Sequence, residues 1–254
     1  MSIPFGVQLW SVRDEIKSAG MANVLSRIGK MGYAAVEFAG YNGHSASEIK
    51  QFLADAGLKV CGTHTGLDTL EGDKLAATVE FHKTIGCEYL IVPGLAAELR
   101  NTPDACKKTA ERFTKASEAL RTHGLKTGFH LHDADVKPLS DGVSAWYHLA
   151  RNTPKDFILQ FDTGNAMMGG EDPVRPLLDF PGRGLSTHIK EFPHDGTTPG
   201  LGQVPWASVL DATKRVAGTK WHVIEIEVYT KFAPMEAIAA SLAAMRVWAG
   251  CCIR

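Results

Sequence analysis

The sequence predicts an α/β protein with one domain, a (β/α)₈ TIM barrel over residues 1–254. A helical segment that ends at a glycine and precedes a short apolar strand recurs along the chain, which is typical of strand–helix units in a parallel sheet. The units recur at about the 30-residue spacing of such steps, and one barrel typically takes roughly 250 residues. No linker or low-complexity segment divides the chain.

A doubly wound open sheet is the alternative architecture for this alternation of helices and strands. It would require a glycine-rich phosphate-binding turn after the first strand. Residues 9–14 (LWSVRD) contain no glycine, so the closed barrel is favoured. Strand ends are expected near residues 10, 38, 64, 93, 132, 162, 190 and 227.

The first half of the chain contains four strand–helix units. A helix over 21–31 has apolar side chains on one face and ends at Gly32, a residue typical of helix C-terminal caps. Ser45 and Glu48 form a capping box at the start of the next helix, which ends at Gly57. Apolar strands are expected over 5–10, 34–38, 58–64 and 88–94.

Two further helices complete this half. One is expected over 73–85 and ends at Gly86. The other begins at Thr102 and Pro103, which suit the N-cap and the first helical position, and ends before Gly124.

The second half contains the longer loops. Segments 133–145, 163–176 and 191–205 are rich in Gly, Pro, Asp and Thr, and a helix over 234–248 follows the last strand. The loops that follow the strands of a barrel form its C-terminal face, where substrates bind, so we expect these loops to cover a site. The strands themselves are expected over 128–133, 157–162, 186–191 and 222–227.

The composition is that of an ordinary globular protein. Hydrophobic residues make up 44%, charged residues 22%, and the net charge is −1, so no basic surface for nucleic acid is indicated. No apolar run is long enough to span a bilayer, and the N-terminus lacks a signal-peptide pattern. The five cysteines, with Cys251 and Cys252 adjacent, show no disulfide or metal spacing. We therefore expect a cytoplasmic protein without nucleic-acid or membrane partners; a homo-oligomer remains open.

Side chains that bind metals stand at the ends of the last four expected strands. Each alone could be a hydrogen-bonded or ion-paired core residue, but the ends of barrel strands converge. Two imidazoles and two carboxylates suit Mn²⁺, Zn²⁺, Co²⁺ or Fe²⁺ better than Ca²⁺ or Mg²⁺. The sequence therefore predicts one divalent metal site. Its ligands are His130, Asp162, His188 and Glu225.

Three of these ligands are followed, two positions later, by a second polar residue on the same face of the strand: His132, Lys190 and Glu227. Two inward carboxylates in an apolar run, Glu225 and Glu227, would cost much free energy unless a cation lay between them. A metal ion or the ammonium of Lys190 could be that cation. We expect all three residues to face the same cavity.

Residues of the first strands are expected to face the metal from the opposite side. Glu37 ends the second strand and His64 the third, and each could equally be an ion-paired or hydrogen-bonded neighbour of the site. Trp10 and Trp206 lie near loops and could wall the pocket against the apolar faces of a sugar ring, or could belong to the core.

Six motifs are spread along the chain in the order FGVQLWSVRD, GLKVCGTHTGL, GFHLHDAD, FDTGNAMMGGEDP, THIKEF and VIEIE. Through them, essentially the whole chain resembles the sugar phosphate isomerase/epimerase superfamily, the xylose isomerase-like (β/α)₈ barrels. The resemblance implies one divalent metal, most often Mn²⁺, with Zn²⁺, Co²⁺, Fe²⁺ or Mg²⁺ as alternatives, held by Glu, Asp, His and Glu. Asp162, His188 and Glu225 match this set, whereas His130 stands where ketose 3-epimerases have a glutamate. A histidine at this position is more similar to the pattern of inosose dehydratases and keto-glycoside enzymes.

The activity that this resemblance implies is a metal-dependent sugar isomerase or epimerase that acts on a sugar or keto-sugar. A base, His132 or Glu227 with Glu37 behind them, removes a proton α to a carbonyl and a metal-bound enediolate results. Lys190 stabilises the developing charge. Loss of a β-substituent from the same intermediate would instead give a keto-sugar dehydratase or a 3-keto-glycoside lyase or hydrolase. Less favoured are a non-catalytic sugar-binding protein and an endonuclease IV-like DNA-repair enzyme, which would need more metal ligands and a basic face.

Overall fold

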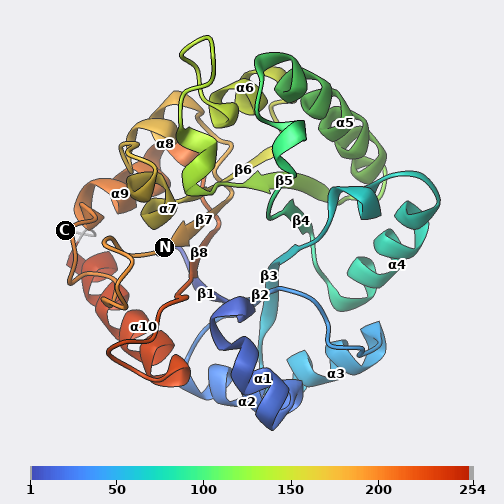
Figure 1. The fold of residues 1–254 in the computed structure, drawn as a ribbon. Helices are drawn as coiled ribbons and strands as arrows, with labels where there is room; N and C mark the ends of the chain where they lie inside the picture. Colours follow the sequence, from blue (N-terminus) through green and yellow to red (C-terminus); the bar gives the residue numbers. More distant parts are fainter. Residues whose placement is uncertain (1, 252–254) are drawn as a thin grey trace.

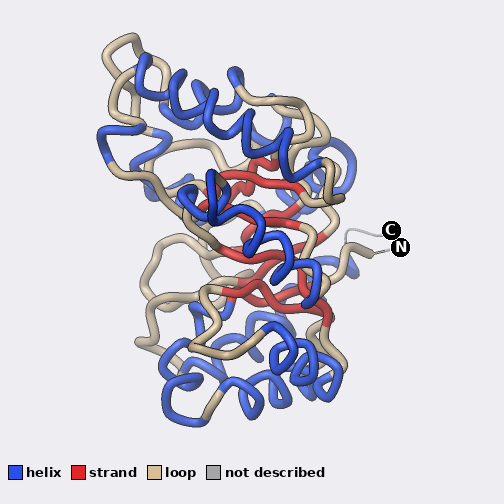
Figure 2. The backbone as a smooth tube through the Cα atoms, turned by 90° about the vertical axis from the view of Figure 1, so that its right-hand side faces the viewer, coloured by secondary structure: helices blue, strands red, loops and turns tan. Residues whose placement is uncertain are grey.

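The protein is described by a computed structural model that covers residues 2–251; Met1 and residues 252–254 lie outside the described part. Within residues 2–251, eight parallel strands close into a barrel in chain order, and β8 pairs with β1. Figure 1 looks into this barrel, with the helices arranged around it, and Figure 2 shows the barrel from the side. The predicted (β/α)₈ fold is confirmed.

The strands are short and most of their residues are buried on both faces, which explains their nearly continuous apolar runs. They are β1 (Phe5–Gln8), β2 (Ala35–Phe38), β3 (Lys59–His64), β4 (Tyr89–Val92), β5 (Lys126–His130), β6 (Ile158–Asp162), β7 (Ser186–Ile189) and β8 (Trp221–Ile224).

The helices between the strands pack around the outside of the barrel (Figure 1). Helix α2 has the predicted bounds and ends at Gly32 with a φ of 92°. The predicted capping box at Ser45 and Glu48 is present. The helices are α1 (Arg13–Ala19), α2 (Met21–Met31), α3 (Ala46–Ala56), α4 (Leu75–Ile85), α5 (Pro103–Arg121), α6 (Ala145–Asn152), α7 (Thr163–Met168), α8 (Arg175–Asp179), α9 (Trp206–Ala212) and α10 (Pro234–Cys251).

Five strands end earlier than predicted: β4 at Val92, β7 at Ile189, and the three strands whose ends change the positions of predicted site residues. Strand β1 ends at Gln8, because the side chain of Gln8 accepts a hydrogen bond from Trp10 N at 3.1 Å and a 3₁₀ turn begins. Strand β5 ends at His130, and β8 at Ile224. His132, Glu225 and Glu227 therefore lie in the segments that leave the strands rather than on them.

Three of the cysteines, Cys61, Cys87 and Cys106, are buried free thiols, in agreement with the expectation of reduced cysteines. Cys252 lies outside the described residues, as does the side chain of Cys251. Within residues 2–251, no helix is long and apolar enough to cross a membrane.

The packing of α2 against α3 leaves no room for a methyl group at Gly29, since a Cβ there would stand 2.2 Å from the backbone oxygen of Ala56. We expect Gly29→Ala to lower the free energy of unfolding by about 1–3 kcal/mol, although alanine favours helices. Chemical denaturation would measure this. Gly250→Ala is the matched control, because Gly250 is an exposed helical glycine with open space around it. Equal stability of both variants would contradict the prediction.

Candidate functional site

A cavity of about 520 Å³ lies at the C-terminal ends of the strands. In a barrel of this kind, this end holds the substrate. Six of the residues that the sequence predicted for the site line the cavity: Trp10, His64, His130, His132, Glu225 and Glu227. A second cavity, of about 510 Å³, lies near the amino ends of β3, β4 and β8 and contains none of these residues.

Four predicted ligands converge beside the first cavity. His130, Asp162 and His188 end or lie on β5, β6 and β7, and Glu225 directly follows β8. Each offers one ligand atom, these atoms all lie within 4.8 Å of one another, and all four residues are buried. Because Asp162 and His188 are paired across the β6–β7 ladder, their side chains share one layer.

Two of these four side chains carry a buried atom that forms no hydrogen bond. Within the described residues, His130 Nδ1 and Asp162 Oδ2 are buried and form no hydrogen bond. Leaving a buried polar atom unpaired costs about 1–3 kcal/mol, so an additional partner is indicated. His188 Nδ1 lies 3.7 Å from Asp162 Oδ2 and 3.1 Å from Glu225 Oε2. The donor set therefore fits a divalent cation held between the four side chains.

The opposite nitrogen of His188 is held by a carboxylate: Nε2 lies 2.6 Å from Glu37 Oε2. A carboxylate on the far side of a metal-binding imidazole fixes its tautomer and orientation. This contact leaves Nδ1 of His188 facing the other ligands, with Glu225 Oε2 at 3.1 Å.

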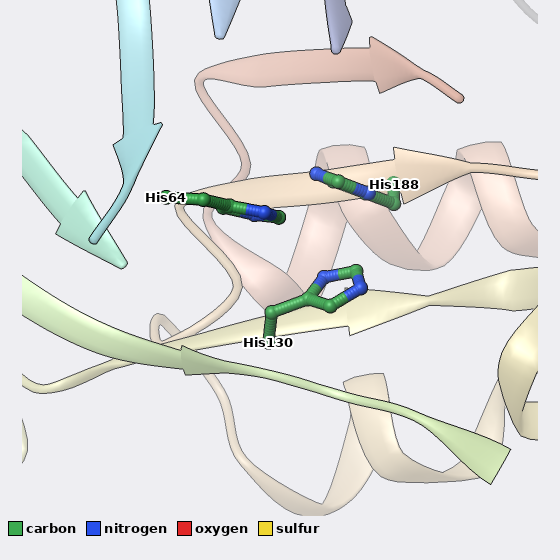
Figure 3. Close-up of side chains that lie close together, drawn as sticks. All are labelled: His64, His130 and His188. Carbon is green, nitrogen blue, oxygen red and sulfur yellow. The ribbon is translucent and has the colours of Figure 1, made fainter. Parts of the chain in front are cut away.

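His64 could form an alternative group with two of the ligands, since His64, His130 and His188 also offer atoms within 4.8 Å of one another. Figure 3 shows these three imidazoles converging from different strands. However, His64 Nε2 is already hydrogen-bonded to Gln160 Oε1 at 2.8 Å. The three-histidine group also brings no negative charge, so the group with two carboxylates is the better cation site.

Burial and neighbouring charges set the protonation of the ligands. Burial, with His188 and His64 nearby, keeps the pKa of His130 well below its ordinary value, so its lone pair is available. Burial also raises the pKa of Asp162 to about 6. For His188, burial favours the neutral imidazole, but the carboxylates of Glu37 and Glu225 outweigh it and raise the pKa to about 10.

The affinity for a divalent cation is expected to fall as the pH is lowered. A cation requires neutral His188 and ionised Asp162, so binding releases the His188 proton below pH about 10 and competes with the Asp162 proton below pH about 6. The apparent Mn²⁺ affinity should fall about tenfold per pH unit between about pH 9 and 6.5, and more steeply below pH 6. Isothermal titration calorimetry would measure this; an affinity that stays constant from pH 8 to 5 would exclude the assignment.

Lys190 lies beside the four ligands and is buried. Its Nζ is 2.6 Å from Glu227 Oε2, 3.2 Å from Glu225 Oε2 and 3.5 Å from Asp162 Oδ2. Burial would lower the pKa of Lys190, but these three carboxylates raise it above its ordinary value, so the side chain is a fixed cation. Asn165, which sequence reasoning did not single out, accepts a hydrogen bond from Nζ at 3.2 Å.

Glu37 does not line the cavity, which argues against the prediction that it acts on substrate. Its side chain is fully buried, and burial, which favours the neutral acid, is outweighed by His64 and His188, so that its pKa lies well below its ordinary value. Gln8 and Gln160 each donate to it, at 2.7 and 2.6 Å. These glutamines were also missed; the available signal was a polar residue within each apolar strand.

The two predicted aromatic walls differ in position. Trp10 lines the cavity and is 45% exposed, with the guanidinium of Arg13 4.6 Å from its ring centre. Trp206 is 2% exposed, does not line the cavity, and donates its Nε1 hydrogen to Glu191 Oε2 at 2.9 Å. The prediction of a substrate contact at Trp206 is therefore corrected: this indole is a buried part of the loop after β7.

Comparison with known proteins identifies the family to which this arrangement is similar. Residues 25–248 match the family model described as xylose isomerase-like TIM barrel. An inosose dehydratase of Geobacillus kaustophilus (strain HTA426) is 24% identical over 211 residues, which cover 72% of this chain and 67% of that protein.

Solved structures show the same fold. A sugar phosphate isomerase/epimerase from Parabacteroides distasonis superposes with a TM-score of 0.83 at 23% identity, over 95% of this chain and 97% of that one. An L-ribulose 3-epimerase superposes with a TM-score of 0.74 at 14% identity, over 100% and 96% of the two chains.

Proposed function

Because the chain belongs to the xylose isomerase-like TIM barrel family, we propose that it is a divalent-metal-dependent sugar isomerase or epimerase. Its reaction is the removal of a proton from the carbon next to a carbonyl, followed by reprotonation of the resulting enediolate. The observation that carries the proposal is the convergence of four buried ligand atoms beside the cavity, among side chains of which His130 and Asp162 each keep a buried atom without a hydrogen bond. A pocket with perturbed titratable groups and convergent polar side chains supports an active site.

The cation would be held by His130, Asp162, His188 and Glu225, with Mn²⁺ as the first choice, and would supply Lewis-acid stabilisation of negative charge on the substrate oxygen. Lys190 adds a fixed positive charge next to Glu225 and Glu227. A preorganised ammonium at this position stabilises the negative charge that develops when the α-proton leaves.

His132 is the proposed general base. It lines the cavity, and its ring lies edge-on to that of His130 at 4.8 Å, one step nearer to solvent. Partial desolvation lowers the pKa of His132 below its ordinary value, so near neutral pH its imidazole is free to accept a proton.

Glu227 reaches the same cavity from the segment after β8. Its Oε2 accepts a hydrogen bond from Lys190 Nζ at 2.6 Å, so this oxygen is already bound by a cation. Glu227 is therefore proposed to bind a substrate hydroxyl, and the protonated imidazole of His132 to return the proton to the enediolate.

A keto-sugar dehydratase or 3-keto-glycoside lyase is the second candidate. The same base would remove the same proton, and the enediolate would then lose its β-substituent. Two observations favour this outcome: the 24%-identical relative is an inosose dehydratase, and this chain has His130 where ketose 3-epimerases have a glutamate that transfers a proton. Within the described residues no arginine lines the cavity, which supports an unphosphorylated substrate.

The proposal is tested by incubating the protein with Mn²⁺ and a panel of keto-sugars, aldoses and 3-keto-glycosides in D₂O. We expect deuterium to enter the carbon next to the carbonyl of at least one compound, as measured by NMR and mass spectrometry. A deuterated isomer or epimer would support the first candidate, and a deuterated elimination product the second.

Removal of the metal is the control for this experiment. A chelator should stop the exchange, and Mn²⁺ should restore it. A protein that binds sugar but binds no divalent ion, and that exchanges no proton in any compound, would instead be a non-catalytic sugar-binding protein, and the proposal would be wrong.

A further inference from the structure

The loop that follows β7 is folded around a buried carboxylate. Glu191 is 4% exposed, and its Oε1 accepts hydrogen bonds from Phe192 N and Val204 N at 3.0 and 3.1 Å. Its Oε2 accepts hydrogen bonds from Gly200 N and Trp206 Nε1 at 2.7 and 2.9 Å. Hydrogen bonds to a charged group contribute about 1.5–3 kcal/mol each, so this carboxylate holds both ends of the loop in place.

Close packing supports the same conclusion. A Cβ at Gly202 would stand 2.4 Å from Phe192 O and 2.6 Å from the side chain of Glu191. Gln203 N also donates to Phe192 O, at 2.8 Å. The loop over residues 191–205 therefore has a defined path beyond the C-terminal end of β7.

This path brings His194 to the site. Its Nε2 lies 3.6 Å from Glu227 Oε2, the oxygen that Lys190 Nζ approaches to 2.6 Å. Within the described residues, His194 Nε2 is a buried atom without a hydrogen-bond partner. Contacts of this kind are often long in the free enzyme and tighten when substrate binds.

We propose that His194 is a positioning residue for Glu227. His194 and Lys190 hold one oxygen of the Glu227 carboxylate from two sides, which orients the other oxygen toward a ligand in the cavity. Glu191 supports His194 indirectly, because it holds the loop that carries it. The inference rests on the proposed function only in assigning Glu227 to substrate binding; the contact between His194 and Glu227 is independent of the reaction.

The contact is tested without substrate, in the whole protein loaded with Mg²⁺ as a diamagnetic cation. The ¹⁵N signals of His194 are assigned by their absence in His194→Leu. We expect Glu227→Gln to shift the Nε2 signal of His194 and to leave that of His123, an exposed histidine after α5, unchanged. An unshifted His194 signal would overturn the proposal whether or not the protein is an enzyme.

Kinetics then separate positioning from a purely structural role, with a compound from the D₂O panel. His194→Leu should lower kcat about 10-fold or more, with metal affinity and melting temperature unchanged, whereas His194→Gln, which retains a donor, should restore kcat toward the wild-type value. In a Glu227→Gln background, His194→Leu should have little further effect. The proposal would be overturned if His194→Leu and His194→Gln lowered kcat equally. It would also be overturned if His194→Leu lowered kcat as much in the Glu227→Gln background as in the wild type. If the NMR shift is present but no compound turns over, the proposed function fails and the contact stands.

Discussion

Asp162→Asn is expected to abolish metal binding and, with it, metal-dependent proton exchange. The substitution keeps the side-chain volume, and the amide oxygen can still accept the hydrogen bond that Asp162 Oδ1 receives from Asn165 N at 2.7 Å. It removes the negative charge from Asp162 Oδ2, a buried atom that forms no hydrogen bond. This atom lies 3.7 Å from His188 Nδ1 and 3.5 Å from Lys190 Nζ. Metal content by mass spectrometry and Mn²⁺ titration would measure the loss.

The melting temperature of Asp162→Asn gives a second test of the assignment of Asp162 as a metal ligand. Burial raises the pKa of Asp162 to about 6, so above that pH the carboxylate is ionised in the metal-free protein and lowers its free energy of unfolding. At pH 8 the metal-free asparagine variant should therefore melt at or above the wild-type temperature, and added Mn²⁺ should raise the melting temperature of the wild type only.

The matched control is Asp156→Asn. Asp156 precedes β6 at the other end of the barrel and forms an ion pair with Arg121 at 2.9 Å. Loss of this exposed ion pair should have little effect on the free energy of unfolding. Metal content and turnover should stay normal in this control. Normal metal content in Asp162→Asn would remove Asp162 from the ligand set.

His132→Gln is expected to keep the metal and to lose turnover. A general base typically contributes about 10²–10⁴-fold in rate without being required for binding, so kcat and the rate of deuterium entry should fall by about that factor. His132 lines the cavity but is not among the four converging ligands, so Mn²⁺ affinity should change little.

Two further variants test the division of roles between the two histidines. His123→Gln, at an exposed position, should retain wild-type rates. His130→Gln should lose the metal. If His132→Gln lost the metal and His130→Gln kept it, the two residues would exchange roles, and the base would have to be sought elsewhere in the cavity.

Much of the fold could be predicted because its determinants are local. The caps at Gly32 and Ser45 depend on neighbouring residues, and the strand–helix period depends on apolar spacing within each segment. The convergence of His130, Asp162, His188 and Glu225 could also be predicted, because closing the strands into a barrel brings their C-terminal ends together whatever the details of packing.

Strand ends and side-chain layers were less predictable. Strand β8 ends at Ile224, although the alternation of VIEIE continues, because the backbone amide of Ile226 donates to the hydroxyl of Ser11 at 3.0 Å instead of to a neighbouring strand. The depth of a side chain inside a barrel depends on strand tilt and stagger, which the sequence of one strand does not reveal. For this reason Glu37 was expected at the cavity but lies beneath it, bonded to Gln8 and Gln160.

By itself, then, the sequence determined the barrel, its helix caps and the set of side chains that converge at the strand ends, because these follow from local chemistry and from closure of the sheet. Only the tertiary structure decided which of the remaining polar and aromatic residues reach the cavity. Trp206 is buried and His194 faces Glu227 because Glu191 joins backbone and side-chain donors up to 15 residues away in the chain. Such contacts form only when the whole loop is folded, and no periodicity in the sequence marks them.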